Sequence, residues 1–183
     1  MNNYKKKIIS HYETVFKNQA NILKWDKGPV NTFSNDFCIL EFSPNQSRDM
    51  WTYATCCMSE ENEFSRIELH IFSKKQDRSI IELLYATAYY HKQFKLNLNH
   101  TINFGRPWQN ESECKFGFIS LPYLDGANLE NLKQNNRFIK FYWLIPITLR
   151  ELEIKKNRGV NALEELFEQE GFDYSNSKRK SLA

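Results

Sequence analysis

Residues 108–123 read WQNESECKFGFISLPY, and residues 138–146 read FIKFYWLIP. The first stretch follows a Gly105–Trp108 turn and predicts an apolar strand over residues 116–121. The second is the most apolar strand candidate of the chain, and we expect it to lie centrally in a sheet. We expect this strand to end at Pro146, because proline cannot donate a hydrogen bond to an interior ladder. These two strands define the core around which the other elements are predicted to pack.

The residues on the N-terminal side of this pair predict helices and further strands. Apolar residues at helical spacing indicate helices over residues 4–23 and 77–94. Ser79 and Glu82 have capping-box spacing for the second helix, with Asp77 as a competing start. The pair Gly28–Pro29 marks a turn. Short apolar or alternating runs bounded by turn residues predict further strands over residues 37–42, 51–58, 66–72 and 98–104. In the third of these runs, residues 67, 69 and 71 predict one apolar face.

Two short helices are predicted after the central strand. Thr148 and Glu151 make a capping box for the first of them. The second extends over residues 162–170, and we expect Asn161 rather than Gly159 to cap it. Gly171 stands where a glycine ends a helix.

The order of these elements predicts an α+β fold. Consecutive strands between isolated helices favour a single domain with a mixed, mostly antiparallel β-sheet packed by α-helices. A chain of 183 residues is long enough for a real core without disulfide bonds or a structural metal. We predict one domain over residues 1–173 and a flexible, polar and basic tail over residues 174–183.

Charge and hydropathy limit the class of partner. The tail holds Lys178, Arg179 and Lys180 and no acid, so the other 173 residues balance 22 basic against 22 acidic side chains (25 less three, against 22). A neutral body lacks the clustered basic face that nucleic-acid binding demands, so no nucleic acid is predicted as a partner. We predict that both basic runs, at residues 5–7 and 178–180, are solvated. No apolar run approaches the ~20 residues of a membrane span, and no signal peptide is recognisable, which favours a cytoplasmic protein without a membrane partner.

No pattern of residues predicts catalysis, a cofactor or a metal site. The four histidines have no metal-ligand spacing, and we expect His70 and His91 to be surface or boundary residues. Cys56 and Cys57 are adjacent, so we expect their side chains to face opposite sides of a strand and share no ligand. Acid pairs at residues 60–61 and 164–165 are interpreted as solvated charge. We therefore predict no catalytic, cofactor-binding or metal-binding residue.

Several segments, taken in order, resemble the suppressor-of-fused-like family. The segments that carry the resemblance are WTYAT at 51–55 with CMS at 57–59, RIELHI at 66–71, GRPW at 105–108, LPY at 121–123, LIPIT at 144–148, ELE at 151–153 and GVNALEELF at 159–167. One departure is Cys57, which stands where the family often has glycine. If that turn requires a positive φ angle, the cysteine is strained there.

The resemblance is to the short, single-domain bacterial branch of the family, and it implies a non-catalytic protein-binding domain. For such members it implies an immunity protein, or antitoxin, that neutralises a cognate toxin by stoichiometric binding. Aromatic anchors commonly carry the affinity of such interfaces. We predict partner contacts by Trp51, Trp108, Tyr123 and Tyr142, although each of these residues also suits core packing. The acids from Glu60 to Glu63 supply part of an acidic patch.

Two other functions stay open. One is a general scaffold module with an endogenous protein partner. The other is an enzyme that pairs Cys56 or Cys57 with a distant histidine. The sequence predicts neither the interface nor the oligomeric state.

Overall fold

The computed structural model describes residues 2–28 and 30–183. Pro29 of the predicted Gly28–Pro29 turn lies outside these residues, while Gly28 has the positive φ of 76° that suits a turn. The helices are α1 Asn3–Phe16, α2 Ser79–Phe94, α3 Ala127–Glu130, α4 Leu149–Arg158 and α5 Val160–Glu170, with a 3-10 turn η1 at Val30–Thr32. The strands are β1 Asn21–Leu23, β2 Cys38–Phe42, β3 Trp51–Cys56, β4 Arg66–Ser73, β5 Thr101–Asn103, β6 Phe116–Ser120, β7 Asn131–Gln134 and β8 Arg137–Ile147.

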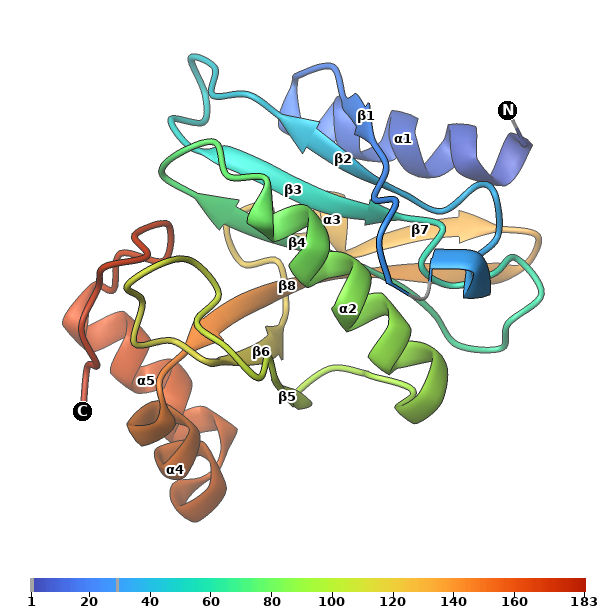
Figure 1. Cartoon of the computed structure of the whole chain (residues 1–183). Coiled ribbons are helices and arrows are strands. Elements are labelled where there is room, and N and C mark those ends of the chain that lie inside the picture. Colours follow the sequence, from blue (N-terminus) through green and yellow to red (C-terminus); the bar gives the residue numbers. More distant parts are fainter. Residues whose placement is uncertain (1, 29) are drawn as a thin grey trace.

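Within the described residues, eight strands form one open sheet in the order β1-β2-β3-β4-β8-β6-β5, with β7 paired to β8 (Figure 1). Every pair is antiparallel except β4 with β8. The predicted α+β fold with a mixed, mostly antiparallel sheet is therefore confirmed. Strand β8 pairs with β4, β6 and β7, so the apolar stretch at residues 138–146 is central, as expected.

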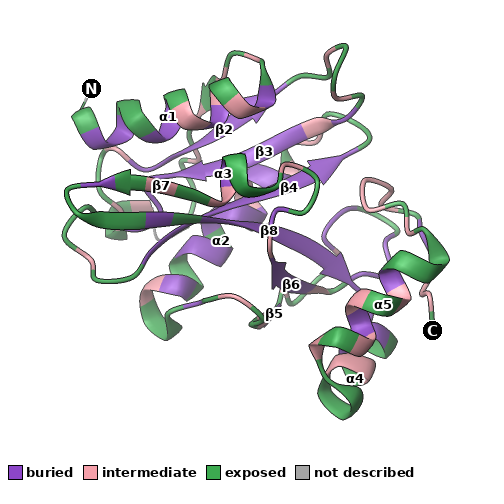
Figure 2. Cartoon of the chain, turned by 180° about the vertical axis from the view of Figure 1, so that it is seen from behind, coloured by how far each residue is buried: buried purple, intermediate pink, exposed green. Residues whose placement is uncertain are grey.

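Helices cover both faces of the sheet. Helix α2 crosses one face, and Figure 2 shows α1 and α3 on the opposite face, with α5 beyond the end of β8. The side chains of β8 alternate between these two faces, because successive residues of a strand point to opposite sides of the sheet. Tyr142 and Leu144 pack beneath α2, and Phe141 packs against α1. Trp143 and Ile145 pack against α4 and α5.

Strand β4 corrects one sequence prediction. Its residues 67, 69 and 71 face α2 as predicted, but the alternate residues are buried too. Glu68 and His70 lie at 0% exposure and Phe72 at 1%. They are buried because α1 and the residues after α5 (171–183, the C-terminal segment) cover that face. His91 is also buried, on the inner side of α2. Neither histidine is a surface residue.

Helix boundaries differ from the prediction at three places. The first helix ends at Phe16, because Lys17 adopts a left-handed conformation with a φ of 51°, and residues 21–23 then form β1. At α2, Asp77 rather than Ser79 supplies the side-chain contact, since Asp77 Oδ1 accepts from Ser79 N at 2.8 Å. Helix α5 begins after Gly159, not after Asn161. The Thr148–Glu151 capping box and the terminal Gly171 are confirmed.

The sheet extends further than predicted in one strand and less in another. Strand β8 continues to Ile147, and Pro146 pairs with Gly117 of β6. At Gly117 a Cβ atom would lie 2.6 Å from the Phe104 ring and 2.7 Å from Leu144, so a larger residue would force these side chains to move. Strand β5 is shorter than the predicted run and covers residues 101–103. The short elements α3 and β7 have no counterpart in the sequence prediction.

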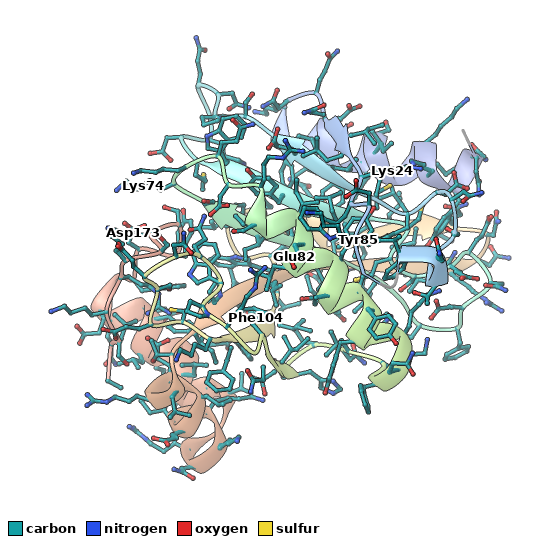
Figure 3. All side chains as sticks on the ribbon, in the orientation of Figure 1. Lys24, Lys74, Glu82, Tyr85, Phe104 and Asp173 are labelled. Carbon is teal, nitrogen blue, oxygen red and sulfur yellow. The ribbon has the colours of Figure 1, made fainter. Side chains whose placement is uncertain are left out.

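The C-terminal segment packs against the body through several contacts. Arg179 Nη1 donates to Glu151 Oε1 at 2.7 Å, and its Nη2 donates to the carbonyl of Pro146 at 2.8 Å. Lys74 N donates to the carbonyl of Ser175 at 2.9 Å, beside the Lys74–Asp173 pair labelled in Figure 3. Arg179 is therefore buried rather than solvated. The flexibility of the tail as a whole stays a prediction.

Lys5 of the N-terminal basic run is buried as well. Its Nζ donates to the carbonyl of Asp36 at 2.7 Å, although we predicted that this run is solvated. Among the described residues, no helix is long and apolar enough to cross a membrane.

Candidate functional site

The four aromatic residues predicted to contact a partner lie at different depths. Trp108 and Tyr142 are each 2% exposed and pack in the core beneath α2, and Trp51 is partly buried against the same core. Tyr123 is 58% exposed. It is therefore the one of the four whose ring is open to solvent. Partner contact by each of the four stays a prediction.

Tyr123 borders a groove of about 330 Å³ on the face opposite α2. Its walls come from the segment after β6, from β8, and from α5 with the residues that follow it; Figure 2 shows β8 running towards α5. We call it the Tyr123 groove. Its apolar lining consists mainly of Tyr123, Leu124, Trp143, Phe167, Phe172 and Tyr174.

The aromatic rings of the groove hold one another in place. Trp143 and Tyr174 meet edge to face with centroids 5.1 Å apart, and Phe167 stacks on Phe172 at 4.3 Å. Such pairs add ~0.5–1.5 kcal/mol each beyond the area that they bury. The guanidinium of Arg179 lies 5.5 Å from the Phe172 ring and helps to position it. These contacts fix the side chains of the rings, so the surface of the groove is preorganised.

Two carboxylates from α5 also line this groove. Glu164 Oε1 accepts hydrogen bonds from Ser120 Oγ and from Tyr123 Oη, each at 3.2 Å. Glu168 lies one helical turn further on and lines the same groove. Partial burial and the nearby charges of Glu164 and Glu168 raise the pKa of Tyr123. Among the described residues, neither glutamate forms an ion pair.

The indole of Trp143 contributes a polar atom to this region. Trp143 is 4% exposed, and its Nε1–H has no hydrogen-bond acceptor among the described residues. Buried donors are usually paired, because an unpaired one costs ~1–3 kcal/mol.

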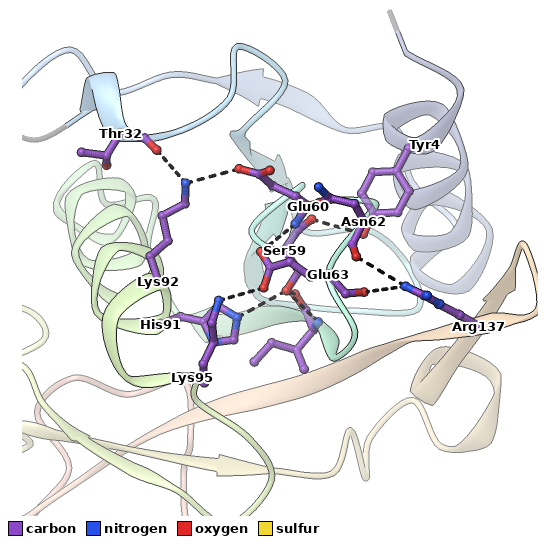
Figure 4. A network of polar contacts seen from close by, with 11 residues as sticks. Tyr4, Thr32, Ser59, Glu60, Asn62, Glu63, His91, Lys92, Lys95 and Arg137 are labelled. Atoms are coloured by element: carbon purple, nitrogen blue, oxygen red, sulfur yellow. Dashed lines mark hydrogen bonds and ion pairs between the residues drawn. The ribbon is translucent and has the colours of Figure 1, made fainter.

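The predicted acidic patch at residues 60–63 is partly neutralised. Glu60 pairs with Lys92 at 3.4 Å, and Glu63 pairs with Lys95 at 2.9 Å, so both ion pairs link the loop to α2 (Figure 4). From the other side, Arg137 Nη1 donates to the carbonyl of Glu63 at 3.4 Å. The loop therefore has a defined conformation, but its negative electrostatic field is weaker than its composition suggests.

The same loop exposes one aromatic ring. Phe64 is 93% exposed, beside the ion pair of Glu63. Glu61 accepts from Gln134 and Asn135, which further restrains the loop. A single exposed ring on a polar loop is a smaller feature than the Tyr123 groove, which combines several rings with two carboxylates.

All four cysteines are buried, and the thiol of Cys56 contacts those of Cys38 and Cys57. Cys57 adopts a φ of 63°, so the strain expected at this position is present, and its Sγ lies 3.9 Å from that of Cys56. The prediction that these two side chains face opposite sides was wrong, because Cys57 has already left the strand. A hydrogen bond with Cys56 and the nearby Lys5 ammonium lower the pKa of the Cys38 thiol to about 7.

The histidines that an enzyme would need lie elsewhere. His91 Nε2 contacts Ser59 Oγ at 3.4 Å, and burial lowers the pKa of His91 to about 4. Burial lowers the pKa of His70 to about 3. Among the described residues, no hydrogen bond joins a cysteine to a histidine, and no group of three or more His, Cys, Asp or Glu side chains is placed to hold a metal ion.

Solved structures resemble this chain over nearly its whole length. A suppressor of fused homolog from Neisseria gonorrhoeae is 29% identical, with a TM-score of 0.86 over 99% of this chain and 97% of that one. A chain of the Sufu-Fu complex gives a TM-score of 0.71 at 17% identity, over 98% and 92% of the two chains. Drosophila Suppressor of Fused gives 0.66 at 17% identity and covers 97% of this chain, which spans 50% of that one.

No curated protein matches the chain. The sequence profile of the Suppressor of fused protein matches residues 34–180. The matched region contains β2 to β8 and all of the residues that line the Tyr123 groove. Because the profile matches far more than half of the sequence, the chain belongs to the suppressor of fused protein family.

Proposed function

We propose that this chain is a non-catalytic immunity protein, an antitoxin that neutralises a cognate toxin by stoichiometric binding. Suppressor of fused proteins are protein-interaction domains, and one structural relative is a chain of the Sufu-Fu complex. The observation that carries the proposal is the Tyr123 groove, which aromatic rings and two carboxylates line together. Interfaces are enriched in such aromatic residues, and a few of them commonly supply most of the affinity.

The contacts of Cys56 and Cys57, the two candidate nucleophiles, support a role without catalysis. Cys56 lies 4.0 Å from the carbonyl of Lys5 and 3.9 Å from the sulfur of Cys57, and hydrogen bonds with the thiols of Cys38 and Cys57, together with burial, raise its pKa. A thiol with a raised pKa is a poor nucleophile, because the thiolate is the reactive form. Four buried cysteines without a disulfide also support a reducing, cytoplasmic location.

Growth rescue tests the immunity function. The protein is co-expressed with the toxin encoded beside its own gene, and the purified mixture is run on size exclusion. We expect growth to be restored and a complex of fixed stoichiometry to elute. Toxicity that persists at full expression, with no complex on the column, would refute the immunity role.

A matched pair of variants locates the interface in the same experiment. Tyr123→Ala removes the exposed ring of the groove, whereas Phe138→Ala removes a ring that is 54% exposed on β8. We expect the first variant to weaken rescue and the second to leave it unchanged. Loss of rescue by Phe138→Ala alone would place the interface elsewhere.

A scaffold module with an endogenous partner is the second candidate, because the same groove would serve it equally well. Co-purification from the native cell separates the two. Recovery of the adjacent toxin supports immunity, and recovery of a different protein in constant ratio supports the scaffold role.

A further inference from the structure

We propose that the Tyr123 groove binds a basic side chain, arginine or lysine, that projects from the partner protein. This inference rests on the proposed function in one respect only, namely that the partner is a protein. It concerns the chemistry of the contact, which the family match does not supply. Aromatic faces, two unpaired carboxylates and a hollow of suitable size are found together in this groove.

The charge of the groove is the first argument. Glu164 and Glu168 both line it, and among the described residues neither has a cationic partner. An apolar partner that covered them would remove water from two carboxylates without a compensating hydrogen bond or charge, which is costly. An acidic partner would add repulsion. A cation compensates both charges and is the occupant that the groove favours.

The aromatic lining is the second argument. A cation within about 6 Å of an aromatic face is attracted by the ring quadrupole, with ~0.5–1 kcal/mol at exposed sites and more when water is excluded. Rings of Tyr123, Trp143 and Tyr174 line the groove beside the two glutamates. Rings together with carboxylates are the combination that recognises ammonium and guanidinium groups.

The chain itself shows the same mode of contact nearby. The guanidinium of Arg179 lies against Phe172 at 5.5 Å while it pairs with Glu151. Arg48 lies 4.4 Å from the Phe16 ring and also pairs with Asp125. In both places an arginine is held between an aromatic ring and a carboxylate. The Tyr123 groove offers the same two kinds of group, and among the described residues no cation pairs with its two glutamates.

The size of the groove is the third argument. A volume of about 330 Å³ is at the lower end of the range for small-molecule pockets, ~300–1,000 Å³. It accommodates one long side chain and part of its neighbours but no folded element. Leu124 and Phe167 give apolar contact for the methylene groups of such a side chain, as long basic residues require.

Synthetic peptides test the inference without knowledge of the toxin. Three seven-residue peptides, identical except for a central arginine, norleucine or glutamate, are titrated into the labelled protein, and the indole resonance of Trp143 is followed by NMR. We expect the arginine peptide to bind about fivefold more tightly than the norleucine peptide, which corresponds to ~1 kcal/mol. The glutamate peptide should bind most weakly.

Charge variants on α5 provide the control. The double variant Glu164→Gln with Glu168→Gln keeps an amide oxygen to accept from Ser120 and Tyr123 but removes both charges. The matched double variant Glu165→Gln with Glu170→Gln removes two charges from exposed positions of the same helix. We expect the preference for arginine to disappear in the first variant and to persist in the second.

The outcomes separate this inference from the proposed function. Equal binding of the arginine and norleucine peptides, no binding of the arginine peptide at millimolar concentration, or an unchanged preference in the Glu164/Glu168 variant overturns the inference. None of these results touches growth rescue, which tests the immunity role by itself. A clear arginine preference without growth rescue would keep the inference and refute the immunity role.

Discussion

Among the single residues, Glu68 is a carboxyl group that lies fully buried in β4, in the middle of the sheet. Thr55 Oγ1 donates to its Oε2 at 2.6 Å, and Met58 N donates to its Oε1 at 3.0 Å. These bonds favour the ionised form. Complete burial outweighs them and raises the pKa of Glu68 from 4.5 to about 8. The proton on this carboxyl therefore links stability to pH.

Replacement of Glu68 by glutamine should reduce the pH dependence of stability. An unfolded glutamate titrates near 4.5 and the folded one near 8, so between these values the folded state holds a proton that the unfolded state has lost. The unfolding free energy contributed by this group therefore falls as pH rises through that interval, by on the order of a few kcal/mol. Urea unfolding at pH 5 and pH 8 measures it. We expect Glu68→Gln to lose less stability between the two than the wild type.

The control for this measurement is Glu165→Gln, on the exposed side of α5. It should keep the pH profile of the wild type. An unchanged slope in Glu68→Gln would mean that Glu68 is already ionised at pH 5 in the folded protein.

At the scale of single residues, the sequence correctly predicted backbone strain at Cys57 but did not predict that His70 is buried. The strain at Cys57 followed from a turn that favours glycine, and its φ of 63° confirms it. The burial of His70 was not predictable from β4 alone, because a polar residue that alternates with apolar ones normally faces water. Helix α1 covers that side of the sheet, and the sequence of β4 alone does not show that a helix from a distant part of the chain packs there.

At the scale of elements, the start of α2 distinguishes two capping schemes. Ser79 with Glu82 has the right spacing for a capping box, yet Asp77 makes the contact in the structure. Asp77 Oδ2 also accepts from Gln109 Nε2 at 2.9 Å, so the loop before β6 selects this aspartate. Spacing within the helix could not reveal that outside partner.

Alanine variants at these two positions should therefore differ. Asp77→Ala removes the side-chain acceptor of Ser79 N and one of Gln109 Nε2, and we expect the unfolding free energy to fall by about 1–2 kcal/mol, the usual cost of a lost cap and one lost hydrogen bond. Ser79→Ala should change it by much less, since Ser79 takes part through its backbone N–H, which alanine keeps. Chemical denaturation of both variants measures the difference. A larger loss in Ser79→Ala would restore the capping-box interpretation.

The elements missed by the sequence analysis are short. Strand β1 has three residues, β7 has four and α3 has four. Such segments are too short for a periodic pattern, and pairing with β2 and β8 gives the two strands their conformation. The long central strand, by contrast, was predictable because its apolar run is itself the cause of its burial.

At the scale of the whole molecule, the Tyr123 groove shows why a site of this kind escapes sequence analysis. Its residues come from positions 120–124, 143–145 and 164–174, which no local motif connects. Tyr123 was predicted as a partner contact from its residue type, but Glu164 was interpreted as solvated charge and Glu168 was not singled out. Only the packing of α5 and the C-terminal segment beside β8 brings these groups together.

The C-terminal segment should therefore support both the fold and the groove. Arg179 forms a bidentate pair with Glu151, at 2.7 and 2.8 Å, and its guanidinium positions Phe172. Removal of one partner from a buried pair leaves the other charge unpaired, at a cost of ~3–5 kcal/mol. Urea unfolding of Arg179→Met should show a loss of this order, and the Trp143 resonance should shift because Phe172 loses its support. Lys178→Met removes a neighbouring cation whose pair with Glu111 is exposed, so we expect no measurable change. Equal stability of the two variants would show that the tail is loose in solution, as its composition alone predicts.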